Sequence, residues 1–132
     1  MRDVVRTRSV PQIIVSDADY QRLTDLATAS LERLPEVAQE LLAEMDRAKV
    51  VKNGNVPDDV VRMGSTVTFT SDDGHTRTLK LVYPVEESLD EHRISVMTPV
   101  GAALIGLSEG QSISWTARDA KHHQLTVTQV KN

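Results

Sequence analysis

The chain has 132 residues, 39% of them hydrophobic, and a formal net charge of −4 at pH 7. This length suits one compact domain, or one small domain with an appendage. The apolar content argues against a disordered chain, because burial of that surface can offset the entropy lost on ordering. The acidic balance and an aromatic content of only 3% argue against DNA wrapping, sequence-specific nucleic-acid binding and stacking of single strands, so protein partners are favoured.

The location of the protein is predicted from what the chain lacks. It has no cysteine, which excludes disulfides, thiol catalysis and thiolate metal sites. No apolar run approaches the roughly 20 residues that span a bilayer, and no apolar signal-peptide segment follows Arg2, Arg6 and Arg8. We therefore expect a cytoplasmic protein without a membrane partner. The basic arm is expected to be a disordered terminus, with phosphate contacts as the less favoured alternative.

Residues 16–49 have the spacing of two amphipathic helices. Ser16 is a good N-cap, and Asp17 and Asp19 add negative charge where the helix dipole favours it. Pro35 follows a break in the pattern and is expected to open the second helix. The stripes comprise Tyr20, Leu23, Leu26, Ala27 and Ser30 or Leu31 in the first helix, and Leu34, Val37, Ala38, Leu41, Leu42, Met45 and Ala48 in the second. This predicts a short antiparallel helical hairpin (a coiled coil) that projects from the rest and buries its two faces against each other.

The rest of the chain has the period of strands. Residues 50–63 contain Asn53, Gly54, Asn55 and Pro57 and are expected to form a linker. Strands are expected around residues 66–70, 77–83, 93–97, 113–115 and 125–130, with a short helix over 99–105. Strands that follow helices in this way indicate an α+β fold with a twisted antiparallel sheet. The predicted parts are an arm with a short extended segment (1–15), the hairpin (16–49), the linker (50–63) and a β domain (64–132).

One run of the β domain carries a resemblance to a known family. The sequence from Arg93 to Leu107, Arg-Ile-Ser-Val-Met-Thr-Pro-Val-Gly-Ala-Ala-Leu-Ile-Gly-Leu, resembles the C-terminal domain of the bacterial Gre transcription factors. Ile13-Ile14-Val15, the run 43–48, the run 57–61 and Leu81-Val82-Tyr83-Pro84 are similar to the Rnk family of Gre-like factors with a shortened hairpin, named for regulation of nucleoside diphosphate kinase. The resemblance then spans nearly the whole chain.

The resemblance implies an FKBP-like C-terminal domain and binding to core RNA polymerase at the rim of its secondary channel. The loop that docks in Gre factors corresponds here to Met97, Thr98 and Pro99, with Ser95 nearby. A proline in the first helical turn stiffens a loop, so a rigid apolar knob loses little entropy when it docks. The structural alternative, which is compatible with docking, is that Thr98 caps the short helix and Pro99 starts it.

The hairpin tip bears on catalysis. Cleavage-stimulating Gre factors hold a metal ion with paired acidic residues there, whereas this tip offers Glu32 and Glu36 with Arg33 between them. Such a set is a weak Mg²⁺ site, because Mg²⁺ needs converging oxygen ligands. The resemblance thus implies a regulator that occupies the channel without stimulating transcript cleavage, neither an enzyme nor a holder of a cofactor.

Three further features of the sequence bear on function. Prolyl isomerase activity needs an aromatic-lined pocket, but Phe69, Tyr83 and Trp115 are expected in the core. His122 and His123 point to opposite faces of a strand and cannot chelate one ion together. The acidic residues of 86–91 are expected to form a solvated loop, with electrostatic steering of a basic partner as the alternative.

The leading hypothesis is therefore a bacterial transcription regulator that binds RNA polymerase. The alternative is a protein-interaction module that acts directly on a metabolic enzyme such as nucleoside diphosphate kinase. The chain itself has no phosphate-binding loop of a kinase, so any effect on a nucleoside diphosphate kinase is expected to be indirect, through transcription of its gene, or to arise through protein contact.

Overall fold

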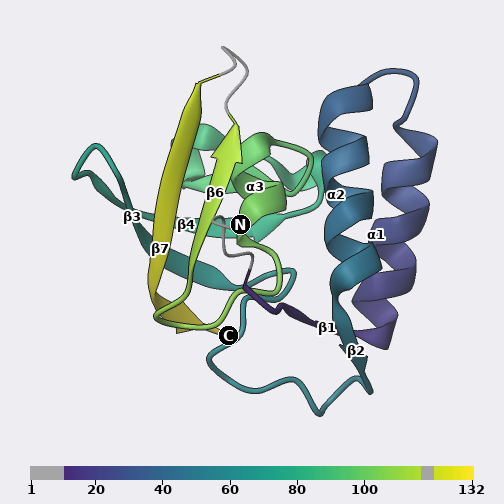
Figure 1. Cartoon of the computed structure of the whole chain (residues 1–132), viewed down its shortest axis with the longest axis horizontal. Coiled ribbons are helices and arrows are strands. Elements are labelled where there is room, and N and C mark those ends of the chain that lie inside the picture. Colours follow the sequence, from purple (N-terminus) through teal and green to yellow (C-terminus); the bar gives the residue numbers. More distant parts are fainter. Residues whose placement is uncertain (1–10, 117–120) are drawn as a thin grey trace, which may run out of the picture.

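The computed structural model describes residues 11–116 and 121–132. The basic arm with Arg2, Arg6 and Arg8 lies outside these ranges. The chain folds as two helices beside a five-stranded sheet, with a small parallel ladder at one end (Figure 1). The elements in chain order are β1 (Ile14–Ser16), α1 (Asp17–Ala29), α2 (Pro35–Arg47), β2 (Lys49–Val51), β3 (Thr66–Ser71), β4 (Thr76–Val82), two 3₁₀ turns, η1 (Pro84–Glu86) and η2 (Leu89–Glu91), then β5 (Arg93–Ser95), α3 (Pro99–Leu104), β6 (Ser112–Thr116) and β7 (His122–Lys131).

The predicted hairpin is confirmed. Ser16 caps α1, its hydroxyl accepting the Asp19 N–H at 3.0 Å, and Pro35 occupies the first turn of α2. The buried residues of both helices are those of the predicted stripes: Leu23, Ala27, Val37, Ala38, Leu41 and Met45. Helix propensity, capping and the spacing of the apolar residues all agree over this segment, so the two helices could be predicted from the local sequence.

The hairpin does not project, however. α3 packs on β6 on one side and on α2 on the other, and Figure 1 shows it between the sheet and the hairpin. The buried side chains of α1 and α2 belong to the same apolar cluster as Val67, Leu81 and Leu125 of the sheet. One face of α2 is therefore buried on the β domain rather than on α1 alone.

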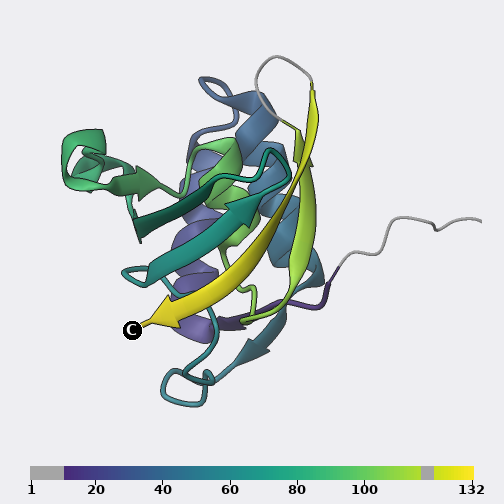
Figure 2. The ribbon, with the colours of Figure 1, turned by 90° about the vertical axis from the view of Figure 1, so that its left-hand side faces the viewer.

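The strand order of the sheet is β5-β4-β3-β7-β6. All neighbouring strands are antiparallel except β4 and β5, which are parallel, so the expectation of an antiparallel sheet is wrong for that pair. A parallel neighbour requires a crossover, and residues 83–92, with the two 3₁₀ turns, supply it (Figure 2). The register of β3 on β7 shifts between Thr68 and Phe69. This bulge lets Val127 and Val130 both face the core although they are three residues apart.

Two segments are more ordered than their sequence indicates. Ile13 is fully buried, and residues Ile14–Ser16 pair in parallel with Lys49–Val51, so residues 13–16 are part of the fold. In the segment expected as a linker (50–63), Val56, Val60 and Val61 are buried. The predicted strand over 93–97 ends at Ser95 because Val96 and Met97 turn inward. Within the described ranges, no helix is long and apolar enough to cross a membrane.

Candidate functional site

The first candidate site is the connection between β5 and α3, residues 95–99, here called the β5–α3 loop. The buried Ser95 Oγ accepts the Met97 N–H at 2.9 Å. The Ser95 carbonyl oxygen accepts the Thr98 hydroxyl at 2.8 Å and the Thr98 N–H at 3.2 Å. Thr98 Oγ1 in turn accepts the Gly101 N–H at 3.0 Å, so it is the N-cap of α3. The structural alternative is thus confirmed for Thr98, and these bonds hold the loop in one conformation.

Burial divides the β5–α3 loop into an anchor and an exposed part. Ser95, Val96 and Met97 are at most 4% exposed, whereas Thr98 and Pro99 are half-buried and reach the surface. Met97 therefore packs in the core and does not form the surface of the expected apolar knob, and its part in docking stays a prediction. Sequence alone could not separate these positions, since Met is common both in cores and on binding surfaces.

Gly101 is the residue that sequence reasoning missed. A Cβ at this position would lie 2.1 Å from the Ser95 carbonyl oxygen, which is far inside van der Waals contact. The first turn of α3 can approach β5 only because residue 101 has no side chain. A glycine inside a short predicted helix was the signal, because glycine disfavours helix interiors unless close packing requires it.

The second candidate site is the hairpin tip, between α1 and α2. Glu32, Arg33 and Glu36 are all exposed, and among the described residues no three acidic or histidine side chains gather as a metal site would require. The turn is closed from inside: Ser30 Oγ donates to the Leu26 carbonyl at 2.8 Å, and the Leu34 N–H donates to the Ser30 carbonyl at 2.8 Å. The tip therefore presents a mixed charge pattern on a well-formed turn.

A polar contact that the sequence did not predict joins the hairpin to the β domain. Asp19 Oδ2 accepts the Met63 N–H at 3.4 Å, and the Arg22 guanidinium carbon lies 4.2 Å from the centre of the Tyr83 ring. Burial raises the pKa of the Asp19 carboxyl and that of the Tyr83 hydroxyl above their ordinary values. Asp19 was expected only as a helix-dipole charge, because its partner is far away in the sequence.

The remaining candidates occupy ordinary structural positions. Phe69 is buried, whereas Trp115 stacks on His123 with ring centres 4.9 Å apart. The acidic segment 86–91 is more than a solvated loop, because Glu87 Oε2 accepts the Ser95 N–H at 3.3 Å and Glu91 pairs with Arg93 at 2.6 Å. Part of that acidic charge therefore helps to hold β5 and the start of the β5–α3 loop.

Comparison with known proteins agrees with this architecture. Residues 56–132 match the model for the C-terminal domain of transcription elongation factor GreA/GreB, and residues 11–51 match the Rnk N-terminus. The "Regulator of nucleoside diphosphate kinase" of Escherichia coli K12 is 42% identical over 108 residues, which are 81% of this chain and 79% of that protein. GreA of Azorhizobium caulinodans is 30% identical over 98 residues, 74% of this chain and 60% of that factor.

A solved structure extends the likeness to the whole fold. The prokaryotic transcription elongation factor GreA/GreB from Nitrosomonas europaea superposes with a TM-score of 0.73 at 32% identity, covering 92% of this chain and 100% of that one. The matched relatives are named as regulators or elongation factors. The chain therefore belongs to the GreA/GreB transcription elongation factor family and carries an N-terminal segment of the Rnk type.

Proposed function

We propose that this protein, a regulator of the elongation-factor type, binds core RNA polymerase near its secondary channel in the cytoplasm and does not stimulate transcript cleavage. The observation that supports this best is the β5–α3 loop, where hydrogen bonds to buried Ser95 tie down a loop whose half-buried Thr98 and Pro99 reach the surface. A surface that is ordered before binding loses little entropy on docking. Membership of the GreA/GreB family makes polymerase the expected partner of that surface.

The length and the tip of the hairpin favour binding in the polymerase channel without stimulation of transcript cleavage. Each helix has 13 residues, or roughly 20 Å at 1.5 Å per residue. Part of that length lies against the β domain, which shortens its reach. Glu32 and Glu36 are exposed with Arg33 between them in the sequence, and among the described residues no three acidic or histidine side chains gather, which disfavours a Mg²⁺ site.

Capture on immobilised core polymerase tests the proposed contact. We expect Pro99→Ala to weaken capture about tenfold, because it loosens the exposed part of the loop. Thr98→Ser should keep both the α3 cap and capture, and Pro57→Ala, at an exposed proline outside the loop, is the matched control. Met97→Ala is expected to weaken capture by lowering the stability of the fold. Its capture is therefore interpreted only once its unfolding curve has been measured. Equal capture of Pro99→Ala and wild type would contradict the role of the loop.

Stalled elongation complexes test the absence of cleavage stimulation. We expect the transcript to stay intact when the protein is added, and Glu32→Ala to behave like wild type. Clear cleavage that Glu32→Ala abolishes would overturn this part of the proposal while leaving polymerase binding in place.

The second candidate is direct action on nucleoside diphosphate kinase, which the name of the 42% identical relative favours. Capture of the protein on immobilised nucleoside diphosphate kinase, compared with capture on polymerase, distinguishes the two candidates. Binding to the kinase at micromolar concentration without binding to polymerase would replace the leading proposal.

A further inference from the structure

The open edge of β4 is the feature that neither the family likeness nor the proposed polymerase contact uses. β4 runs over Thr76–Val82, but β5 pairs only with Lys80, Leu81 and Val82. His92 adopts a left-handed conformation (φ 59°, ψ 38°) and turns the chain before β5 away from the strand. Residues 76–79 of β4 therefore have no strand neighbour on this side within the described ranges.

The direction of the backbone groups follows from the bonds around this edge. The Lys80 N–H donates to the His92 carbonyl and the Val82 carbonyl accepts the Val96 N–H, so even-numbered residues of β4 face the β5 side. Leu81 instead bonds to Ser65 on the β3 side. By this alternation, Thr76 and Thr78 present their N–H and C=O groups at the open edge.

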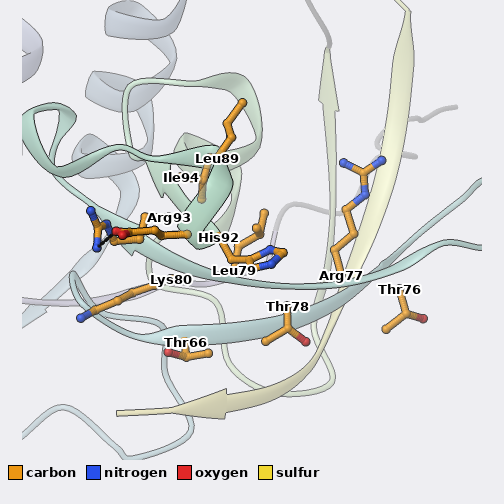
Figure 3. Close-up of a pocket in the computed structure, with 11 residues that line it drawn as sticks. Thr66, Thr76, Arg77, Thr78, Leu79, Lys80, Leu89, His92, Arg93 and Ile94 are labelled. Atoms are coloured by element: carbon orange, nitrogen blue, oxygen red, sulfur yellow. Dashed lines mark ion pairs between the residues drawn. The ribbon is translucent and has the colours of Figure 1, made fainter.

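A groove of about 900 Å³ lies along this edge (Figure 3). On the inner face it is lined by Leu79, Ile94 and Leu89, of which Leu89 is 71% exposed. On the outer face, Lys80 and Arg93 are paired positions of the β4–β5 ladder. Figure 3 shows Arg77 on the side of Leu89, and Thr76 and Thr78 on the opposite side of the strand.

The residues that line the groove have a net positive charge, opposite in sign to the net charge of the chain. Among the described residues, its lining contains Arg77, Lys80 and Arg93 and one carboxylate, that of Glu91, which is paired with Arg93. Arg77 and Lys80 are exposed, and neither has an ion pair with another described residue. In a chain of net charge −4, this local excess of positive charge attracts an acidic partner. The chain's own basic segment 1–10 has the wrong sign to occupy it.

We propose that the β4 edge binds an extended acidic peptide segment of a partner protein, which adds as a strand beside Thr76–Leu79. Its backbone pairs with Thr76 and Thr78, its apolar side chains face Leu79, Ile94 and Leu89, and a carboxylate faces Lys80. This is β-strand addition, in which main-chain bonds supply affinity and alternate side chains supply specificity. Nucleic acid is less well suited, because the groove has apolar walls and no Phe, Tyr or Trp for base stacking.

The test uses an acetylated, amidated heptapeptide of alternating glutamate and valine, added to the full chain while amide hydrogen exchange is followed by NMR. At ten times the dissociation constant, exchange at Thr76 and Thr78 should slow about tenfold, as mass action requires. Arg77 and Leu79 serve as internal controls, because their N–H groups face β3. Lys80→Glu should weaken binding about fivefold or more, whereas Lys52→Glu, the same charge change in an exposed turn, should not.

Each alternative has its own outcome. No binding up to millimolar peptide, or equal binding of a peptide with N-methyl groups on alternate amides, would overturn strand addition. Equal binding of the lysine-for-glutamate peptide would overturn the acidic specificity. Tighter, Lys80-dependent binding of oligothymidine would assign the groove to nucleic acid, and a dimer with protected Thr76 and Thr78 before peptide is added would assign it to a second copy. Pro99→Ala should leave peptide binding unchanged, so the inference and the polymerase contact fail separately.

Discussion

Gly101 shows how much a single missing side chain determines at the candidate site. Gly101→Ala should destabilise the protein by about 3 kcal/mol or more, because the Ser95 carbonyl that the new Cβ meets at 2.1 Å is backbone and cannot rotate away. Urea unfolding gives the free energy. Gly110→Ala is the matched control, since φ is +90° there and no atom lies within 4 Å of an added Cβ. Only the left-handed backbone then opposes alanine, at about 1–2 kcal/mol. Equal losses in the two variants would contradict the close approach of α3 to β5.

Asp19 is a second residue whose role comes from a distant partner. Burial raises the pKa of its carboxyl above the ordinary 3.8, despite the Met63 N–H and the positive charges of Arg22 and Arg62. The folded state therefore binds this proton more tightly than the unfolded state. The sign follows: stability falls as pH rises from about the ordinary value through the raised pKa.

Asp19→Asn should remove this dependence, because the amide keeps an acceptor for the Met63 N–H without a charge. Relative to wild type, the variant should become more stable as pH is raised from acid to neutral, measured by urea unfolding at several pH values. Asp73→Asn should show the opposite sign, since its bond with His75 lowers the pKa of the Asp73 carboxyl. The same slope in both variants would contradict the assignment.

At the scale of elements, the β1–β2 ladder ties the start of the hairpin to its end. The Ile14 N–H donates to the Gly106 carbonyl at 3.1 Å, and the Lys49 N–H donates to the Ile13 carbonyl at 2.9 Å. Gly106, with φ +82°, has Ile13 Cβ only 2.7 Å from where its own Cβ would be. The segment after α3 thus has a glycine because β1 passes directly over it.

Ile13→Ala should therefore cost about 2–5 kcal/mol, as expected for a fully buried isoleucine. Val50→Ala, in the paired strand β2 but 43% exposed, should cost about 1 kcal/mol or less. Thermal and urea unfolding measure both. A loss below about 1 kcal/mol for Ile13→Ala would mean that burial of the residue before β1 contributes little to the fold.

The elements that the sequence predicted well are those with a local cause. Capping by Ser16, the helix-starting Pro35 and the two apolar stripes act within a few residues, so α1 and α2 could be placed from sequence. The same holds for Thr98 and Pro99 at the start of α3. By contrast, β1 and β2 have three residues each, too few for a periodic pattern to distinguish them from an arm and a linker.

At the scale of the whole molecule, one apolar cluster links the hairpin to the sheet. Leu41 of α2 and Leu104 of α3 are both fully buried, and α2 packs on α3. The hairpin and the β domain should therefore unfold together in one transition. Urea unfolding followed by far-ultraviolet circular dichroism reports mainly on the helices, and Trp115 fluorescence reports on β6. The two midpoints should coincide; a helical transition at clearly lower urea would mean that the hairpin is an independent unit.

The open β4 edge is likewise a property of the folded chain. Nothing in the local sequence of residues 76–79 marks this edge as unpaired. The edge is open because β5 pairs only with the end of β4 and His92 turns the preceding chain away. The apolar and basic residues that line the groove come from two strands and the crossover between them. Only the tertiary arrangement brings them to one edge.

Patterns within short stretches of chain were enough to predict the α+β class, the helical hairpin, the family and the position of the β5–α3 loop. Long-range packing was needed to establish which residues of that loop reach the surface, the close approach at Gly101, the parallel β4–β5 pair and the packing of the hairpin on α3. These features depend on contacts between residues distant along the chain. Burial and strand pairing follow from the summed packing of many elements, whereas capping and periodicity follow from neighbours.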